Sequence, residues 1–212
     1  EDHAVLEKKG FLLVDSGATY MDGTTDITRT YPLGELTEDE KRFYTWTLQS
    51  HIDLARAVWL DYCECKMIDT IAREPLWRHL INYRCGTGHS VSFVGNVHEG
   101  PHALNSRNTT RMRPGMVVTD EPGVYETDLV GIRIENELVC IHKADNQYGT
   151  FLGFEPLTFV PIATSPILPG VLDKDELAWL NDYHRQVFAK LAPHLNAEER
   201  VWLAEKCASI GC

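Results

Sequence analysis

The sequence lacks several features that would place it in other classes of protein. No stretch approaches the roughly 18 consecutive apolar residues of a membrane-spanning helix, and no basic segment with an apolar core opens the chain. Basic residues are scarce, since 20 Lys and Arg stand against 31 Asp and Glu, which gives a net charge of −11. We therefore expect neither a membrane nor a nucleic acid to be a partner.

The cysteines form neither the paired spacing of a zinc ribbon nor the dense framework of a disulfide-bonded domain. They lie at Cys63, Cys65, Cys85, Cys140, Cys207 and Cys212. We interpret them as reduced thiols of a cytoplasmic protein. The 212 residues are 43% hydrophobic and 24% charged, which is ordinary for a globular fold with one substantial core.

Four acidic residues and one histidine lie at the ends of short, apolar, strand-like runs. They are Asp15, Asp26, His89, Glu121 and Glu135. Gathering four carboxylates without metal is costly, because two unit charges 4 Å apart repel by about 4 kcal/mol at an effective dielectric of 20. A pair of divalent ions needs several carboxylates, and an imidazole among them suits manganese, cobalt, iron or zinc better than calcium. The residues therefore predict a site for two divalent metal ions.

Six short motifs contain or flank these residues. They are LVDSGA through DGTTDITRT (13–30), GTGH (86–89), NVHEGP (96–101), VTDEPG (118–123), GIRIEN (131–136) and FEPLT (154–158). In this order they resemble the pita-bread metallopeptidases, and specifically the cytosolic aminopeptidase P (X-prolyl aminopeptidase) branch. The resemblance extends from about residue 10 to the C-terminal region.

The resemblance implies a role for each predicted ligand. Asp15 would chelate one metal, Asp26 and Glu135 would bridge the two, and His89 and Glu121 would complete the other. Manganese is the ion that the family implies, with zinc or cobalt as alternatives.

The family reaction hydrolyses the first peptide bond of peptides with proline at the second position, by a metal-activated hydroxide. In that reaction Glu121 would shuttle the proton, and His98 would steady the substrate carbonyl or the oxyanion. Two alternatives stay open: a prolidase-like dipeptidase on the same fold, and a non-catalytic relative that binds peptides or proteins. The full-length protein is expected to be a homodimer.

Strand patterns around the predicted ligands agree with this interpretation. Asp22-Gly23 predicts a hairpin turn between residues 11–14 and 27–31, which leaves Asp15 and Asp26 on one face but four residues out of line. A bulge near residues 16–18 is then needed. In a second alternating run, residues 131–141, Arg133 neighbours Glu135 and is predicted to hydrogen-bond an acidic ligand, although a solvated charged face would give the same pattern.

The chain departs from the family pattern in places. Cys85 lies where the family usually has a histidine, and Ser90 and Ser92 replace the usual glycines, so we expect altered substrate contacts there. The family's catalytic domain also begins upstream of residue 1, which predicts low activity for this chain alone. Of the remaining histidines, His102 is expected to border the substrate cleft, whereas His3, His51, His79, His142, His184 and His194 are expected to be ordinary surface or helix residues.

Helix signals complete the predicted organisation. Capping boxes begin helices after Thr37, Asp173 and Asn196, and helical pieces over 66–73 and 76–83 are predicted to be interrupted or kinked at Pro75. We therefore predict an α+β pita-bread (creatinase/aminopeptidase-like) fold, incomplete at its N-terminus. Residues 1–165 would form the catalytic domain and residues 166–212 a C-terminal helical extension.

Overall fold

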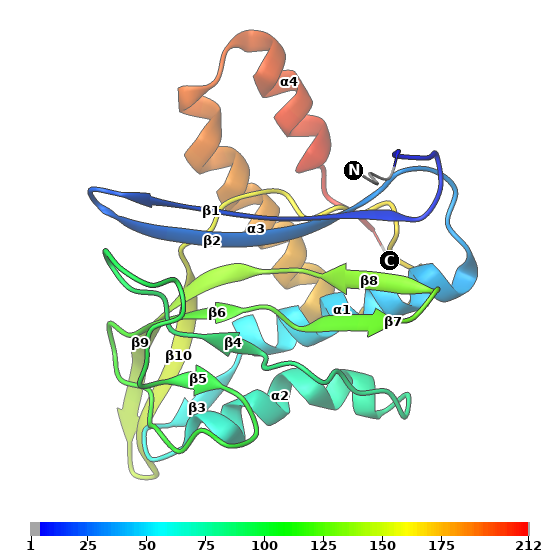
Figure 1. The fold of residues 1–212 in the computed structure, drawn as a ribbon. Helices are drawn as coiled ribbons and strands as arrows, with labels where there is room; N and C mark the ends of the chain where they lie inside the picture. Colours follow the sequence, from blue (N-terminus) through cyan, green and yellow to red (C-terminus); the bar gives the residue numbers. More distant parts are fainter. Residues whose placement is uncertain (1–4, 212) are drawn as a thin grey trace.

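The computed structural model describes residues 5–211. It contains a long β-hairpin, a four-stranded antiparallel sheet and four α-helices (Figure 1). The hairpin consists of β1 (Phe11–Tyr20) and β2 (Gly23–Pro32). The sheet has the order β3-β10-β9-β6, formed by β3 (Val58–Leu60), β10 (Gly149–Pro156), β9 (Asn136–Asn146) and β6 (Val117–Asp120). Two short antiparallel pairs complete the strands: β4 (Gly88–His89) with β5 (Ala103–Leu104), and β7 (Gly123–Glu126) with β8 (Val130–Arg133). His3 and Cys212 lie outside the described residues.

Three helices begin at the predicted capping boxes. They are α1 (Glu38–Ala55), α3 (Lys174–Leu191) and α4 (Ala197–Lys206), the last two being joined by the short 3-10 helix η1 (Ala192–His194). In each box the cap side chain accepts a hydrogen bond from the backbone of the third helical residue, whose Glu side chain returns to the cap. These contacts are local in sequence, and the predictions of all three helix starts are confirmed.

The predicted break at Pro75 is wrong. A single helix, α2 (Cys65–Trp77), contains Pro75 near its end, where the missing N–H removes only one hydrogen bond. The helix ends beyond Pro75 because Leu80 adopts a left-handed conformation with φ 60°, and Ile81 N–H donates back to the carbonyl of Leu76 at 3.1 Å. This is the Schellman arrangement, which usually uses glycine, so no residue type at this position signals it in the sequence.

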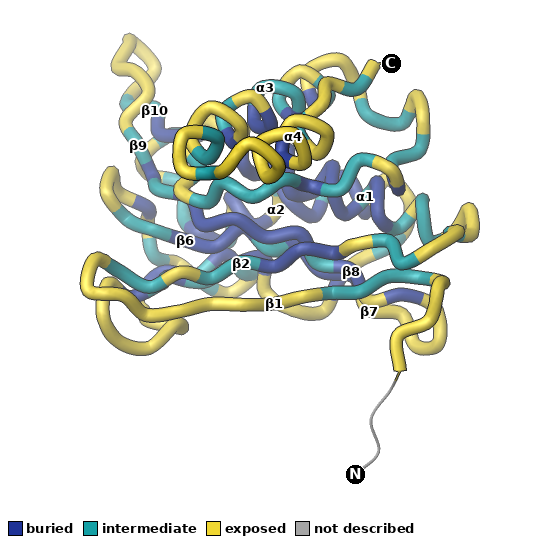
Figure 2. The backbone as a smooth tube through the Cα atoms, turned by 90° about the horizontal axis from the view of Figure 1, so that it is seen from above, coloured by how far each residue is buried: buried dark blue, intermediate teal, exposed yellow. Residues whose placement is uncertain are grey.

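The core lies between the sheet, the helices and the short strand pairs. One cluster joins α2 to the sheet through Ile68, Leu138 and Phe154. A second joins α1, β8 and α3 through Leu48, Ile132 and Leu180, while β1 and α4 stay largely exposed at the periphery (Figure 2). The division of the chain at residue 165 stays a prediction, although α3 shares this second core. Within residues 5–211, none of the helices combines the length and apolar character needed to cross a membrane.

Candidate metal centre

The β1–β2 hairpin presents Asp15 and Asp26 on one face. Its two-residue turn is Met21–Asp22, one position earlier than the sequence predicted. Asp15 then lies opposite Thr28 and Asp26 opposite Gly17, so the two acids are two residues out of line rather than four. The predicted bulge is absent, because the register is unbroken along both strands, all of whose residues the structure describes. The earlier turn, rather than a bulge, therefore brings Asp15 and Asp26 closer together.

Glu135 enters the site at a break between β8 and β9, since the predicted continuous strand is two shorter ones. Its backbone N–H donates to the Thr28 carbonyl at 3.1 Å, and Thr28 Oγ1 donates to its carboxylate Oε2 at 2.6 Å. Only 1% of Glu135 is exposed. Burial, together with the negative charge of Glu121, raises the pKa of Glu135 to about 8. A carboxylate in this position is kept ionised by a nearby cation.

His89 on β4 and Glu121, which follows β6, contact each other. His89 Nε2 lies 3.1 Å from Glu121 Oε1 and 3.5 Å from Asp26 Oδ2. Thr119 links the two segments, since its hydroxyl donates to Glu121 Oε1 at 2.8 Å and accepts from the backbone N–H of His89 at 2.9 Å. Burial opposes protonation of His89, but its hydrogen bonds to Asp26 and Glu121 outweigh burial and raise the pKa of His89 to about 10. The surrounding acids thus favour a positive charge here.

Asp15 lies at the solvent edge of the cluster, with 51% of its side chain exposed. Arg133 forms an ion pair with it and also hydrogen-bonds the Tyr125 hydroxyl. The same guanidinium donates from Nε to Thr28 Oγ1 at 3.0 Å and lies 3.8 Å from Glu121 Oε2. Arg133 therefore contacts acidic residues from the hairpin and from the β6–β7 connection.

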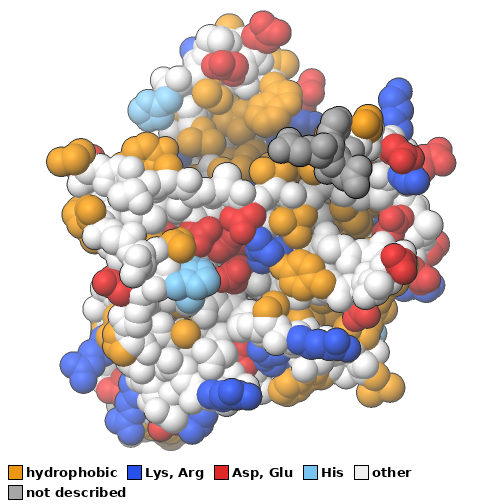
Figure 3. All heavy atoms as spheres, viewed as in Figure 1, with side chains coloured by type: hydrophobic (Ala, Val, Ile, Leu, Met, Phe, Trp, Pro, Cys, Tyr) orange, Lys and Arg blue, Asp and Glu red, His pale blue; other side chains and the backbone are white. Residues whose placement is uncertain are grey.

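The structure brings the predicted ligands to one region from four separate segments. Ligand atoms of Asp26, His89 and Glu135 all lie within 4.8 Å of one another. Glu121 adjoins this group through His89, whereas Asp15 lies farther out beside Arg133. Acidic side chains gather beside a histidine and a basic side chain on the face below the hairpin (Figure 3). Carboxylate oxygens with one imidazole form a donor set that suits a divalent transition metal.

Three other residues lie near the cluster, and the sequence motifs pointed to only two of them, His98 and Cys85. The exposed His98 ring lies 3.9 Å, centroid to centroid, from that of His89. Cys85 Sγ contacts the carbonyl of Gly123 at 3.6 Å. Glu137 was not singled out, although the strand alternation places it on the same face as Glu135. Burial raises the pKa of Glu137 to about 7, although the nearby backbone of Asp26 acts to lower this pKa.

A buried polar layer supports the ligands from behind. Arg29 donates to the carbonyl of Glu135 at 2.5 Å and to Asn136 Oδ1 at 2.7 Å. His51, expected to be an ordinary surface or helix residue, has its Nδ1 3.2 Å from Asp120 Oδ2, and both side chains are fully buried. Burial raises the pKa of Asp120 to about 6, although His51 opposes this. These contacts fix the backbone next to Glu121 and Glu135.

Comparisons with known proteins match this chain to one family of metallopeptidases. Residues 1–142 match the model of metallopeptidase family M24, and residues 150–210 match the C-terminal region of peptidase M24. A probable Xaa-Pro aminopeptidase P from Laccaria bicolor is 40% identical over 99% of this chain and 34% of its own length. Aminopeptidase P1 from Lotus japonicus is 42% identical over 100% of this chain and 33% of its own. The chain thus spans about a third of the length of these relatives.

Solved structures of proline-specific peptidases also resemble this chain. An X-prolyl aminopeptidase from Caenorhabditis elegans, described as a cytosolic enzyme with a di-nuclear active site, matches 93% of this chain and 33% of its own with a TM-score of 0.88 and 40% identity. Prolidase from Pyrococcus furiosus matches 72% of this chain and 42% of its own with a TM-score of 0.62 and 28% identity. The resemblance to the C. elegans enzyme covers more of this chain and has the higher TM-score and sequence identity.

Proposed function

This chain belongs to metallopeptidase family M24 and has its pita-bread fold, and from that premise we propose that it carries the metal centre of an aminopeptidase that removes the first residue of X-Pro peptides. The observation that carries this proposal is the convergence of Asp26, His89 and Glu135 within 4.8 Å, with Glu121 3.1 Å from His89. The names of the relatives with about 40% identity support the substrate class.

The cluster fits two divalent ions. Asp26 and Glu135 would bridge them, Asp15 would hold one, and His89 and Glu121 would hold the other. Carboxylate oxygens with a single imidazole suit Mn²⁺, with Zn²⁺ and Co²⁺ as alternatives. When bound, such ions lower the pKa of water and polarise the scissile carbonyl. Asp15 would turn from Arg133 toward the cluster, and Arg133 would orient the Asp15 carboxylate.

Glu121 would move the proton in this reaction. Thr119 holds its carboxylate at 2.8 Å, and Arg133 lies 3.8 Å away. Glu121 takes a proton from the attacking water and delivers it to the proline nitrogen as the C–N bond breaks. His98, beside the ring of His89, donates a hydrogen bond to the substrate carbonyl oxygen as negative charge develops there.

The prolidase-like alternative is supported by the resemblance to Pyrococcus prolidases. The length of the peptides that are cleaved distinguishes it from an aminopeptidase. A dipeptidase cleaves X-Pro but not X-Pro-Ala, whereas an aminopeptidase cleaves the tripeptide. A non-catalytic binding relative would bind peptide without turnover, but the presence of all five ligand residues argues against it.

We further infer that the longer protein is a cytoplasmic homodimer that acts on peptides with proline second. The description of the C. elegans enzyme as cytosolic supports the location. The dimer rests on the family resemblance.

The test is metal analysis combined with peptide cleavage. Protein loaded with Mn²⁺ and dialysed should retain two ions per chain and release the first residue of X-Pro-Ala but not of X-Ala-Ala. Glu135→Ala should lose at least one ion, because it removes a bridging carboxylate, and its turnover should fall with the metal. The matched control is Glu155→Ala, which removes an exposed acid on β10 and should keep both metal ions and the wild-type turnover. Equal metal content in all three proteins would refute the assignment of the centre.

A further inference from the structure

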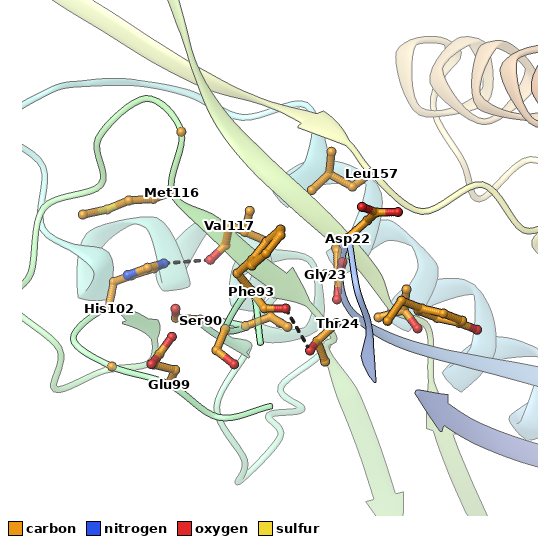
Figure 4. A pocket seen from close by; sticks show the side chains of 17 residues that line it. Asp22, Gly23, Thr24, Ser90, Phe93, Glu99, His102, Met116, Val117 and Leu157 are labelled. Atoms are coloured by element: carbon orange, nitrogen blue, oxygen red, sulfur yellow. Dashed lines mark hydrogen bonds between the residues drawn. The ribbon is translucent and has the colours of Figure 1, made fainter. Parts of the chain in front are cut away.

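A cavity of about 790 Å³ lies beside the proposed metal centre. Its walls come from the β1–β2 turn, the loop after β4, the segment before β6, and β9. In the view of Figure 4, His102 and Met116 line one side and the turn residues Asp22 to Thr24 another, with Phe93 between them. A cavity of this size accommodates a side chain or a small ligand.

Three buried polar atoms in the lining have no hydrogen-bond partner among residues 5–211. They are Ser92 Oγ, His102 Nδ1 and Glu137 Oε1, on residues that are 4%, 6% and 7% exposed. His102 Nε2 lies 2.7 Å from the carbonyl oxygen of Val117, which only accepts, so Nε2 carries the proton and Nδ1 of the neutral ring is an acceptor. Leaving such atoms unpaired is costly, which favours a ligand that donates several hydrogen bonds.

The charge of the lining is of one sign. Asp22, Glu99 and Glu137 contribute carboxylates, and the lining contains neither lysine nor arginine. Apolar side chains are also present, among them Met116 and Leu157. Carboxylates at one point and apolar walls around them match a side chain with an aliphatic stem and a cationic head.

The cavity adjoins the metal centre through the chain itself. Ser90 in the lining follows His89, and Thr25 precedes Asp26. Glu137 in the lining lies on β9, two residues after Glu135. The lining therefore includes residues close in sequence to three of the proposed ligands, Asp26, His89 and Glu135.

Basic side chains lie near the centre but outside this lining. Arg133 pairs with Asp15 and lies 3.8 Å from Glu121, and Cys85 borders a second cavity lined by Arg84 and Arg107. A short peptide has a positive amino end and a negative carboxyl end. The acidic lining of the first cavity favours a peptide whose amino end points toward it.

We propose that this acidic cavity binds the cationic side chain of a first-residue Arg or Lys, with Glu137 as the specificity-determining residue. The inference rests on the proposed function, since it assigns a preference to that same site. Several N–H groups of a guanidinium or ammonium would satisfy Glu137 Oε1, His102 Nδ1 and Ser92 Oγ.

The test compares Arg-Pro-Ala with citrulline-Pro-Ala, a nearly isosteric but neutral peptide. The ratio of their kcat/KM values is independent of the fraction of enzyme that is loaded with metal. The wild-type ratio should favour Arg by about ten- to a hundredfold, the range expected for a charged hydrogen bond. Glu137→Gln should bring the ratio close to one, whereas Glu155→Gln, which removes the same charge at an exposed position, should leave it unchanged.

A binding measurement keeps the two proposals apart. Argininamide should shift the NMR signals of His102 and Ser92 in chelator-treated protein, and citrulline amide should not. If X-Pro peptides are cleaved without a preference for Arg and argininamide does not bind, the cavity proposal is wrong and the proposed function stands. If no X-Pro peptide is cleaved but argininamide binds in a Glu137-dependent way, the cation site stands and the proposed function fails. The wild-type comparison decides the matter even if Glu137→Gln does not fold.

Discussion

His184 makes the stability of this protein depend on pH in a way that can be worked out from its surroundings. It lies on α3, is fully buried, and accepts a hydrogen bond at Nε2 from the backbone N–H of Ile162 at 3.1 Å. Burial, together with the charge of Arg29, lowers the pKa of His184 from 6.5 to about 4. The neutral ring is therefore the folded form, since a proton on Nε2 would break the bond to Ile162.

The sign and size of the effect follow from proton linkage. Between pH 6.5 and 4 the unfolded chain binds a proton at His184 that the folded chain does not bind, so stability falls as pH falls. The contribution is fully present above pH 6.5 and is lost toward pH 4. A shift of this size corresponds to about 3 kcal/mol of unfolding free energy.

The assay is urea denaturation at several pH values from 7 to 4, in the presence of a chelator. In His184→Gln the amide oxygen can still accept from Ile162, but the position no longer titrates. Wild type should therefore lose about 3 kcal/mol more than this variant between pH 7 and pH 4. His194→Gln, at an exposed position, is the control and should follow wild type. A constant difference between wild type and His184→Gln across this range would refute the reasoning.

Two further predictions concern the metal centre. His98→Ala should leave metal content nearly intact but lower X-Pro turnover by about a hundredfold, because it removes a donor to the substrate carbonyl; metal loss equal to that of Glu135→Ala would show that His98 is a ligand instead. Thr28→Val should weaken metal binding by about ten- to a hundredfold, because the 2.6 Å bond that orients Glu135 is lost, and metal titration that matches wild type would contradict this.

The sequence by itself determined the features that depend on neighbouring residues or on motif chemistry. The helix starts at Thr37, Asp173 and Asn196 followed from capping boxes, in which both partners lie within one helical turn. The family followed from ordered motifs, and the count of four acids with one histidine pointed to divalent metals because of the charge repulsion among them. The ends of elements were less accessible: α2 stops at a left-handed Leu80, which has no local signal.

Tertiary structure decided how distant segments meet. The position of the β1–β2 turn, which fixes the offset between Asp15 and Asp26, was set by the pairing of whole strands rather than by the Asp22-Gly23 dipeptide. The bond between Thr28 and Glu135 joins positions 107 residues apart. The unpartnered atoms of Ser92, His102 and Glu137 likewise share one cavity only because the loop after β4 and strand β9 fold together. Such contacts depend on packing between elements, and a hydrophobic pattern specifies which face of a strand is buried but not which polar atom meets it there.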